Sequence, residues 1–324
     1  MPHKFNKAKR HHIPKQKYKV TNWAAYNAAL KKRGRIDIFI SEELIAGWSK
    51  TRIHDGHGSS QHYSREAILA CHQLRLVFHL PLRQTQGFVE SVFAMMKTTL
   101  SVPAISTLCE RLKKLGIRTP DFKNSNANTE DIVAIAIDST GLKQYGRDEW
   151  HQEKHKVKSK ASWRKAHFSV GDNHLIYGAK MSDKNTWDHE VVDALVAQTD
   201  VAVEQVYGDK GYDENAVYET LTQRFPEADI VIPPKDNLNG SGHYHPKRGA
   251  HIDEIARSGV PAWQKNHQYG KRNVSEMAMQ RYKRTFGNRL HAREFERQEQ
   301  EMMIACGVLN KFTGFGMPQS YRTA

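Results

Sequence analysis

The stretch DIVAIAIDSTGLK, residues 131–143, places a carboxylate in the middle of an apolar run. A short apolar run with β-branched residues and a following glycine predicts a buried strand. Because side chains alternate between the two faces of a strand, Asp138 shares its face with Ala134 and Ala136. A carboxylate among small side chains can be approached by another element or by an ion, so Asp138 is the first candidate site residue.

The segments that follow this strand predict an α/β domain, a mixed sheet with helices around it. The hydrophobic spacing and the turn residues define each element. In chain order we expect a hairpin over 166–181 turning at Gly171-Asp172-Asn173, a helix over 186–198, a strand over 203–209, a helix over 213–225, a strand over 228–234, an insertion at about 235–268, and a last helix from near Arg272.

Two further acidic residues occupy special positions in this order. Asp209 ends the strand over 203–209 beside Gly208, and strand ends are where open α/β sheets place their chemistry. Glu276 lies four positions after Arg272 on the last helix. Each has a simpler interpretation when taken alone, because aspartate often forms turns or helix caps and Glu276 can pair with Arg272 along the helix.

Convergence of the three carboxylates changes that interpretation. In a sheet of this order the first strand, the end of the fourth strand and the last helix can meet, and three carboxylates repel one another unless cations hold them. Carboxylate oxygens suit Mg²⁺ or Mn²⁺, and two such ions can promote phosphoryl transfer. We therefore predict a two-metal site at Asp138, Asp209 and Glu276, with Arg272 and Lys283 able to meet phosphates from the same helix face.

The overall charge indicates a polyanionic partner. The chain has 324 residues, a formal net charge of +14 and a pI near 9.6, which favours nucleic acid first and an anionic membrane second. The longest apolar stretch, residues 132–137, is too short to span a bilayer. The three cysteines form no C-x-x-C pair, and there is no Walker or G-x-G-x-x-G motif. We expect a cytoplasmic protein without a membrane partner or nucleotide cofactor.

The basic charge is concentrated at the N-terminus. Residues 1–36 hold eleven Lys or Arg and no acidic residue, so they form either a solubilising tail or a phosphate-binding arm. Trp23 and Tyr26 add stacking or packing groups, and we favour the arm. Its candidate DNA contacts are Lys7, Arg10, Lys15 and Lys17. A second basic run beside the first acidic block is expected to follow a DNA backbone, through Lys154, Lys156, Lys158 and Lys160.

Residues 37–118 predict a small helical module, followed by a polar linker over 119–130. One helix is expected to start after Ser64 as N-cap, another after Pro81 and a third near Pro103. Three short helices are compatible with a helix-turn-helix DNA reader and equally with a plain helical bundle. As a reader, the module would contact DNA through Arg75, Arg83 and Gln84.

The last helix and two other blocks carry a resemblance to a known family. The spacing Y-x2-R-x3-E-x6-K falls on Tyr269, Arg272, Glu276 and Lys283. Asp138 lies in IDSTGLKQYGRDEWHQEKH (137–155) and Asp209 in GDKGYD (208–213). With these residues the sequence resembles bacterial insertion-sequence transposases of the DDE class, most closely the insertion-sequence-five family. The resemblance also covers residues 79–91 and 106–115.

This resemblance implies an RNase H-like catalytic domain over 131–312, leaving residues 313–324 as a tail. It implies that Asp138, Asp209 and Glu276 bind the metal ions, and that Tyr269, Arg272 and Lys283 contact DNA. The implied reaction is hydrolysis at the terminal inverted repeats of a mobile element, followed by attack of the 3′-OH on target DNA. A homo-oligomer is expected on double-stranded DNA, because two element ends must be joined.

Two other interpretations remain for the whole chain. One is a nuclease of the same fold that never joins DNA; the basic arm, the helical module and the full signature of the last helix count against it. The other is a transposase-derived DNA-binding protein without catalysis, against which the intact acidic triad counts.

Two side-chain features receive structural interpretations. His243, His245 and His251 could suggest zinc, but without a fourth regularly spaced ligand we expect a solvated loop over 233–251. We expect Trp187 to pack in the core rather than to stack on a base.

Overall fold

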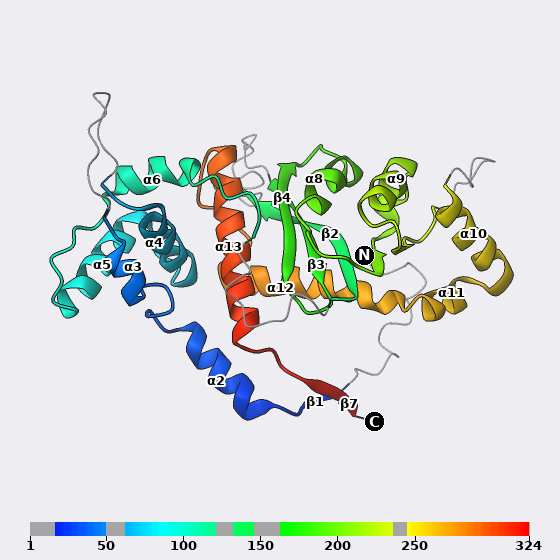
Figure 1. Cartoon of the computed structure of the whole chain (residues 1–324), viewed down its shortest axis with the longest axis horizontal. Helices are drawn as coiled ribbons and strands as arrows, with labels where there is room; N and C mark the ends of the chain where they lie inside the picture. Colours follow the sequence, from blue (N-terminus) through cyan, green and yellow to red (C-terminus); the bar gives the residue numbers. More distant parts are fainter. Residues whose placement is uncertain (1–16, 50–61, 121–131, 146–162, 236–244, 324) are drawn as a thin grey trace, which may run out of the picture.

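The computed structural model describes residues 17–49, 62–120, 132–145, 163–235 and 245–323. Its centre is a five-stranded mixed sheet in the order β4-β3-β2-β5-β6 (Figure 1). The central strand is antiparallel to β3 and parallel to β5, and β5 is parallel to β6. The strands are β2 (Ala134–Lys143), β3 (Trp163–Gly171), β4 (Ile176–Asp183), β5 (Gln205–Tyr207) and β6 (Asp229–Val231).

The predicted mixed sheet and the predicted hairpin are confirmed. β3 and β4 pair as neighbours in antiparallel register, with the turn at the predicted glycine. The strands predicted over 203–209 and 228–234 exist but contain only three residues each. Asp138 lies opposite Phe168 of β3, near the middle of the central strand.

The two faces of the sheet are buried by different helices. Ala134 and Ala136 belong to the core that includes α12 (Asn273–Phe286) and α13 (Phe295–Phe315). Ile135 and Ile137 point into a second core, formed with α8 (Val192–Val196) and α9 (Asn215–Arg224). Alternation along β2 therefore places the backbone of α12 near small side chains, on the same face as Asp138.

The helix expected to begin near Arg272 is present as α12, but it is not the last one, because α13 follows it and was not predicted. This 21-residue helix is buried over most of its length and packs against β4, α4 and α6. Its segment MMIACGVL is buried at every position, so it has no polar face. The apolar spacing that identifies a surface helix is therefore missing.

The three helices predicted in the N-terminal module are confirmed as α4 (Arg65–Val77), α5 (Leu82–Met95) and α6 (Ile105–Lys114). Ser64 caps α4, because its hydroxyl accepts a hydrogen bond from the N–H of Ala67 at 3.0 Å. A short helix, α3 (Glu42–Ala46), precedes them. These helices share one apolar core with α12 and α13, so the module is joined to the sheet by packing. The helix-turn-helix interpretation stays a prediction.

Part of the basic N-terminal arm belongs to the folded structure. β1 (Lys17–Val20) pairs with β7 (Ser320–Thr323), and α2 (Trp23–Arg33) follows. The guanidinium of Arg33 donates to the carbonyl of Gly316 at 2.9 Å, so α2 is fixed to the end of α13. Lys7, Arg10 and Lys15 lie outside the described residues.

The insertion between β6 and α12 contains two helices, α10 (Pro246–Ser258) and α11 (Val260–Asn266), and a short 3-10 turn, η5 (Tyr269–Arg272). The expected loop over 233–251 is therefore wrong from residue 246 onward, because Pro246 starts a helix at a position that suits proline. In Figure 1 these helices lie at the opposite end of the molecule from α4 to α6. Among the described residues, no helix combines the length and apolarity needed to cross a bilayer.

The buried Asn310 of α13 gives a test of how the edge strand β4 is held. Its amide group donates to the carbonyl of Ile176 at 2.8 Å and accepts from the N–H of Ile176 at 2.8 Å. Replacing Asn310 with Ala leaves both backbone groups unpaired, so we expect a loss of about 2–4 kcal/mol in the free energy of unfolding, measured by urea denaturation. Asn27→Ala on the exposed side of α2 is the control. Equal stability of both variants would contradict this role.

Candidate active site

Asp138 is held by three hydrogen-bond donors on the face of β2 that α12 covers. Its Oδ1 accepts from the N–H of Ser139 at 2.8 Å, and its Oδ2 accepts from Arg272 Nη1 at 3.2 Å and from Ser275 Oγ at 3.3 Å. Burial raises the pKa of Asp138 to about 6; the Ser139 N–H opposes this rise, and the negative charges of Asp209 and Glu276 add to it. The neighbouring donors therefore do not fully compensate the ionised carboxylate for its loss of water.

Asp209 lies two residues after the end of β5 and caps a short 3-10 turn, η4 (Lys210–Tyr212). Its Oδ1 accepts a hydrogen bond from the N–H of Gly211 at 2.8 Å. A Cβ atom at position 211 would lie 2.9 Å from the same oxygen, so a larger residue there would displace the carboxylate of Asp209. Parallel pairing of Tyr207 with Ala136 places the end of β5 beside β2, and the negative charge of Asp209 adds to the rise in the pKa of Asp138.

Glu276 lies in the first turn of α12 and forms an ion pair with Arg272 Nη2. The same guanidinium contacts Asp138, so Arg272 links the two carboxylates. The predicted i,i+4 pair is therefore present, and Arg272 brings Glu276 and Asp138 together. The convergence of all three carboxylates stays a prediction. The side chain of Glu276 is 52% exposed, whereas that of Asp138 is 15% exposed, so the site opens toward solvent on the side of α12.

The donor set of this site fits a divalent cation. Its carboxylates come from three separate elements, and carboxylate oxygens are the ligands that Mg²⁺ and Mn²⁺ prefer. Burial first, and the two neighbouring carboxylates in addition, raise the pKa of Asp138 and disfavour its ionised form. Arg272 supplies part of the positive charge that this arrangement needs.

Tyr269 and Lys283, the other two residues of the predicted signature, are both partly buried. The hydroxyl of Tyr269 donates to the carbonyl of Gly208 at 3.2 Å, and its ring lies 5.8 Å from the guanidinium carbon of Arg272. Burial raises the pKa of Tyr269 to about 12, so the phenol stays protonated and serves as a donor. Lys283 is half-buried on α12, and burial lowers its pKa.

The sequence did not identify a network on the opposite face of β2. Ser139 Oγ donates to Asp188 Oδ2 at 2.9 Å, and Lys165 Nζ donates to Asp188 Oδ1 at 2.8 Å. Asp188 starts a short 3-10 helix, η3 (Asp188–Val191), where an aspartate normally suggests only a cap. The hydroxyl of Tyr212 is buried near Asp188, Asp138 and Asp209 and has no hydrogen-bond partner among the described residues. No spacing in the sequence links these residues.

The predictions for two individual side chains, Arg75 and Trp187, are wrong. Arg75 is buried and lies 3.6 Å from Glu301 of α13, so it is not available to DNA. Its position on the inner side of α4 follows from packing against α13. Trp187 is 67% exposed rather than packed in the core, and its ring stacks on His189. It lies in the connection before η3, where no other described element covers it.

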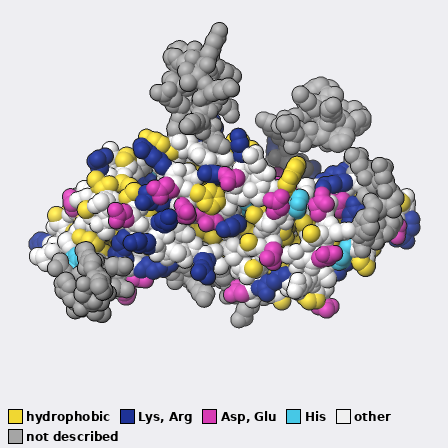
Figure 2. All heavy atoms as spheres, turned by 90° about the horizontal axis from the view of Figure 1, so that it is seen from above, with side chains coloured by type: hydrophobic (Ala, Val, Ile, Leu, Met, Phe, Trp, Pro, Cys, Tyr) yellow, Lys and Arg dark blue, Asp and Glu magenta, His cyan; other side chains and the backbone are white. Residues whose placement is uncertain are grey.

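The remaining DNA-binding candidates are only partly described. Arg83, Gln84 and Lys17 are exposed, whereas Lys154, Lys156, Lys158 and Lys160 lie outside the described residues. Figure 2 shows one face on which Lys and Arg are intermixed with Asp and Glu. The described residues of this face therefore do not mark a DNA path by charge alone.

The raised pKa of Asp138 predicts a cost to folding. Its carboxyl titrates near pH 6 in the folded chain and near about pH 4 when unfolded. The ionised group therefore destabilises the fold increasingly as pH rises from about 4 to 6. We expect the stability of Asp138→Asn relative to wild type to rise by about 1–3 kcal/mol between pH 4 and pH 7, measured by metal-free urea denaturation. A difference independent of pH would contradict the raised pKa.

Comparison with known protein families identifies the family of this chain. Two family models described as Transposase DDE domain match the chain, one over residues 31–147 and the other over residues 129–311. The second match covers more than half of the chain and includes Asp138, Asp209 and Glu276. The mixed sheet flanked by helices fits the RNase H-like domain of such proteins. The family as a whole cleaves and joins DNA and generally uses divalent metal ions. The chain belongs to the DDE transposase family, of the insertion-sequence type.

Proposed function

We propose that this protein binds the ends of its insertion sequence, hydrolyses the DNA phosphodiester bond and transfers the resulting 3′-OH end to target DNA. The observation that supports the proposal is the pairing of Asp138 on β2 and Glu276 on α12 with the same guanidinium of Arg272, while the charge of Asp209, after β5, acts on Asp138. In the proposed reaction Asp138, Asp209 and Glu276 hold the metal ions.

Two Mg²⁺ or Mn²⁺ ions would supply activation of the attacking oxygen and stabilisation of the leaving oxygen. The chain's own residues fix the geometry around them. The N–H of Ser139 and the hydroxyl of Ser275 orient the carboxylate of Asp138. The turn at Gly211 orients Asp209, and the first turn of α12 carries Glu276. Each ligand is thus supported by backbone or by a neighbouring side chain, which favours catalysis by preorganisation.

Arg272 has two successive roles in this proposal. In this structure it neutralises Asp138 and Glu276, which would otherwise repel each other. With divalent ions bound to the carboxylates, the guanidinium of Arg272 would be available to a DNA phosphate, for which its planar fork is well suited. Tyr269 lies against it and limits the directions in which it can move.

Double-stranded DNA is the proposed partner, as terminal inverted repeats and as target. The proposed contacts beyond the site are Lys283, Arg83, Lys17 and the basic residues outside the described ranges, namely Lys7, Arg10, Lys15, Lys154, Lys156 and Lys158. A homo-oligomer on DNA follows from the need to bring two ends together. A cytoplasmic location would give the protein access to bacterial DNA.

Substitution of each acidic residue tests the metal site. Asp138→Asn, Asp209→Asn and Glu276→Gln should each lower Mg²⁺-dependent cleavage of an inverted-repeat duplex by at least about 10³-fold, because each removes a charged ligand. DNA affinity in gel-shift assays should change little, since phosphate contacts dominate it. Glu219→Gln, an exposed change on α9, is the control. Full cleavage by one variant would remove that residue from the site.

Joining of the cleaved end separates a transposase from a nuclease. We expect wild-type protein to link a pre-cleaved 3′-OH end to a target plasmid, and Asp138→Asn to abolish this reaction. Sequencing of the junctions provides the measurement. Cleavage without any joined product would favour the nuclease alternative.

Removal of residues 1–16 tests the basic arm without disturbing β1 or α2. The deleted segment contains Lys4, Lys7, Lys9, Arg10 and Lys15. If these side chains bind phosphates, the slope of log affinity against log salt should become shallower by about 0.9 for every phosphate that the shortened protein no longer neutralises. Full-length protein with Lys7, Arg10 and Lys15 changed to Gln should show the same direction of effect. An unchanged slope in both would make this segment a tail rather than a DNA-binding arm.

A further inference from the structure

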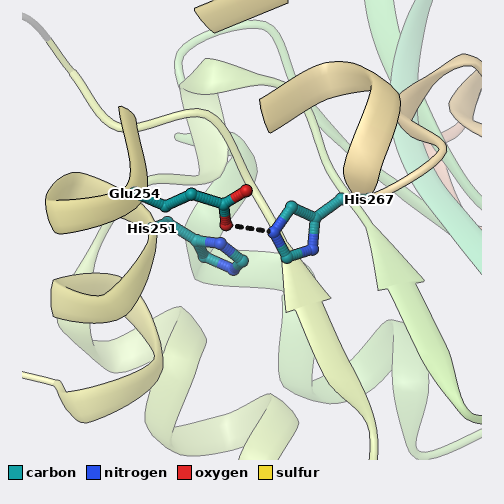
Figure 3. Close-up of side chains that lie close together, drawn as sticks. All are labelled: His251, Glu254 and His267. Carbon is teal, nitrogen blue, oxygen red and sulfur yellow. Dashed lines mark hydrogen bonds and ion pairs between the residues drawn. The ribbon is translucent and has the colours of Figure 1, made fainter. Parts of the chain in front are cut away.

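A second cluster of potential metal ligands lies in the insertion between β6 and α12, apart from the acidic triad. His251 and Glu254 are one turn apart on α10, and His267 follows α11. One ligand atom from each residue lies within 4.8 Å of the others, and Figure 3 shows the three side chains turned toward one another. The ligands of a tetrahedral zinc ion lie roughly 3.4 Å apart, so small side-chain movements would close this cluster around an ion.

Neighbouring groups orient both imidazole rings as ligand histidines are usually oriented. His251 Nε2 lies 2.8 Å from the carbonyl of Ile230. Because a carbonyl can only accept, Nε2 carries the proton and Nδ1 keeps its lone pair. His267 Nδ1 lies 2.9 Å from Asp229, and this contact directs Nε2 to within 2.7 Å of Glu254. A histidine that binds a metal through one nitrogen commonly donates its other N–H to such a carbonyl or carboxylate.

The surroundings of the cluster suit a partly open site. The side chain of His251 is 4% exposed, whereas those of Glu254 and His267 are 24% and 20% exposed. An ion can therefore enter beside Glu254 and keep a water molecule as its fourth ligand. The indole N–H of the buried Trp263 donates to His251 Nδ1 at 3.0 Å, so an ion bound at Nδ1 would break this hydrogen bond and take the acceptor of the indole N–H. The ion would also displace the proton of the hydrogen bond between His267 Nε2 and Glu254.

We propose that His251, Glu254 and His267 bind one zinc ion, as a site separate from the acidic triad. Two imidazole nitrogens and one carboxylate oxygen favour Zn²⁺ over Mg²⁺, which prefers oxygen ligands alone. The ion links α10 to the end of α11, and through Asp229 and Ile230 to the edge strand β6. The ion would also lie close along the chain to η5, because His267 is two residues before Tyr269.

This zinc ion would position the segment that presents Arg272. Tyr269 packs against Trp263, with ring centroids 5.4 Å apart, and its hydroxyl contacts the carbonyl of Gly208 beside Asp209. Fixing His267 therefore limits the movement of η5 relative to the end of β5. The binding of zinc stands independently of the proposed reaction, whereas this effect on Arg272 depends on it.

Calorimetric titration of Zn²⁺ into the full, chelator-treated chain tests the proposal. The buffer contains excess Mg²⁺, so that the acidic triad does not compete for zinc. We expect one site in wild type and at least about a 10-fold loss of affinity in Glu254→Gln and in His267→Asn, with folding checked by thermal unfolding. Asp253→Asn, the exposed neighbour on α10, should bind as wild type does. Asp138→Asn should keep the zinc affinity and lose Mg²⁺-dependent cleavage.

Three outcomes would overturn the zinc site. They are the absence of zinc binding by wild type, equal binding by folded Glu254→Gln and His267→Asn, and loss of zinc binding in Asp138→Asn. The last outcome would assign the ion to the acidic triad. Because zinc affinity and DNA cleavage are measured separately, failure of this proposal leaves the proposed transposition reaction intact, and the reverse also holds.

Discussion

The guanidinium of Arg272, held between Asp138 and Glu276, is the interaction on which the candidate site depends. A carboxylate on the covered face of a central strand is costly, because burial removes water from the charge. The structure lowers that cost with a backbone N–H, a serine hydroxyl and one arginine. Burial still raises the pKa of Asp138 to about 6, so these donors offset the cost only in part.

The rest of the fold brings this arginine into place. Alanines on β2 allow α12 to approach, and the tilted ring contact between Phe168 and Tyr282 fixes the same helix against β3. Helix α13 packs against α12, and both helices share one apolar core with the N-terminal helices. On the opposite face of β2, Asp188 holds Ser139, the residue whose N–H supports Asp138. The ligand geometry is therefore set from both faces of the sheet.

The two ligand clusters differ in chemistry and are linked by one short segment. The triad consists of carboxylates, which suit Mg²⁺ or Mn²⁺, whereas the insertion offers two imidazoles and a carboxylate, which suit zinc. Tyr269 and Arg272 of η5 lie between them in the chain. An insertion whose first part was expected to be loop thus contains helices whose packing reaches the edge of the acidic site through Trp263 and Tyr269.

Local patterns in the sequence determined the strand around Asp138, the Ser64 cap, the hairpin and the signature helix, because these depend on neighbours a few positions apart. The acidic triad was predicted from the place of each carboxylate in the expected elements and from the resemblance to a known family, and it stays a prediction. Tertiary structure alone decided the course of α13, the burial of Arg75 and the exposure of Trp187. It also decided the contacts of Asp188 with Ser139 and of His251 with His267. A helix buried on all sides has no periodic pattern, and contacts between distant residues are fixed only when packing brings their elements together.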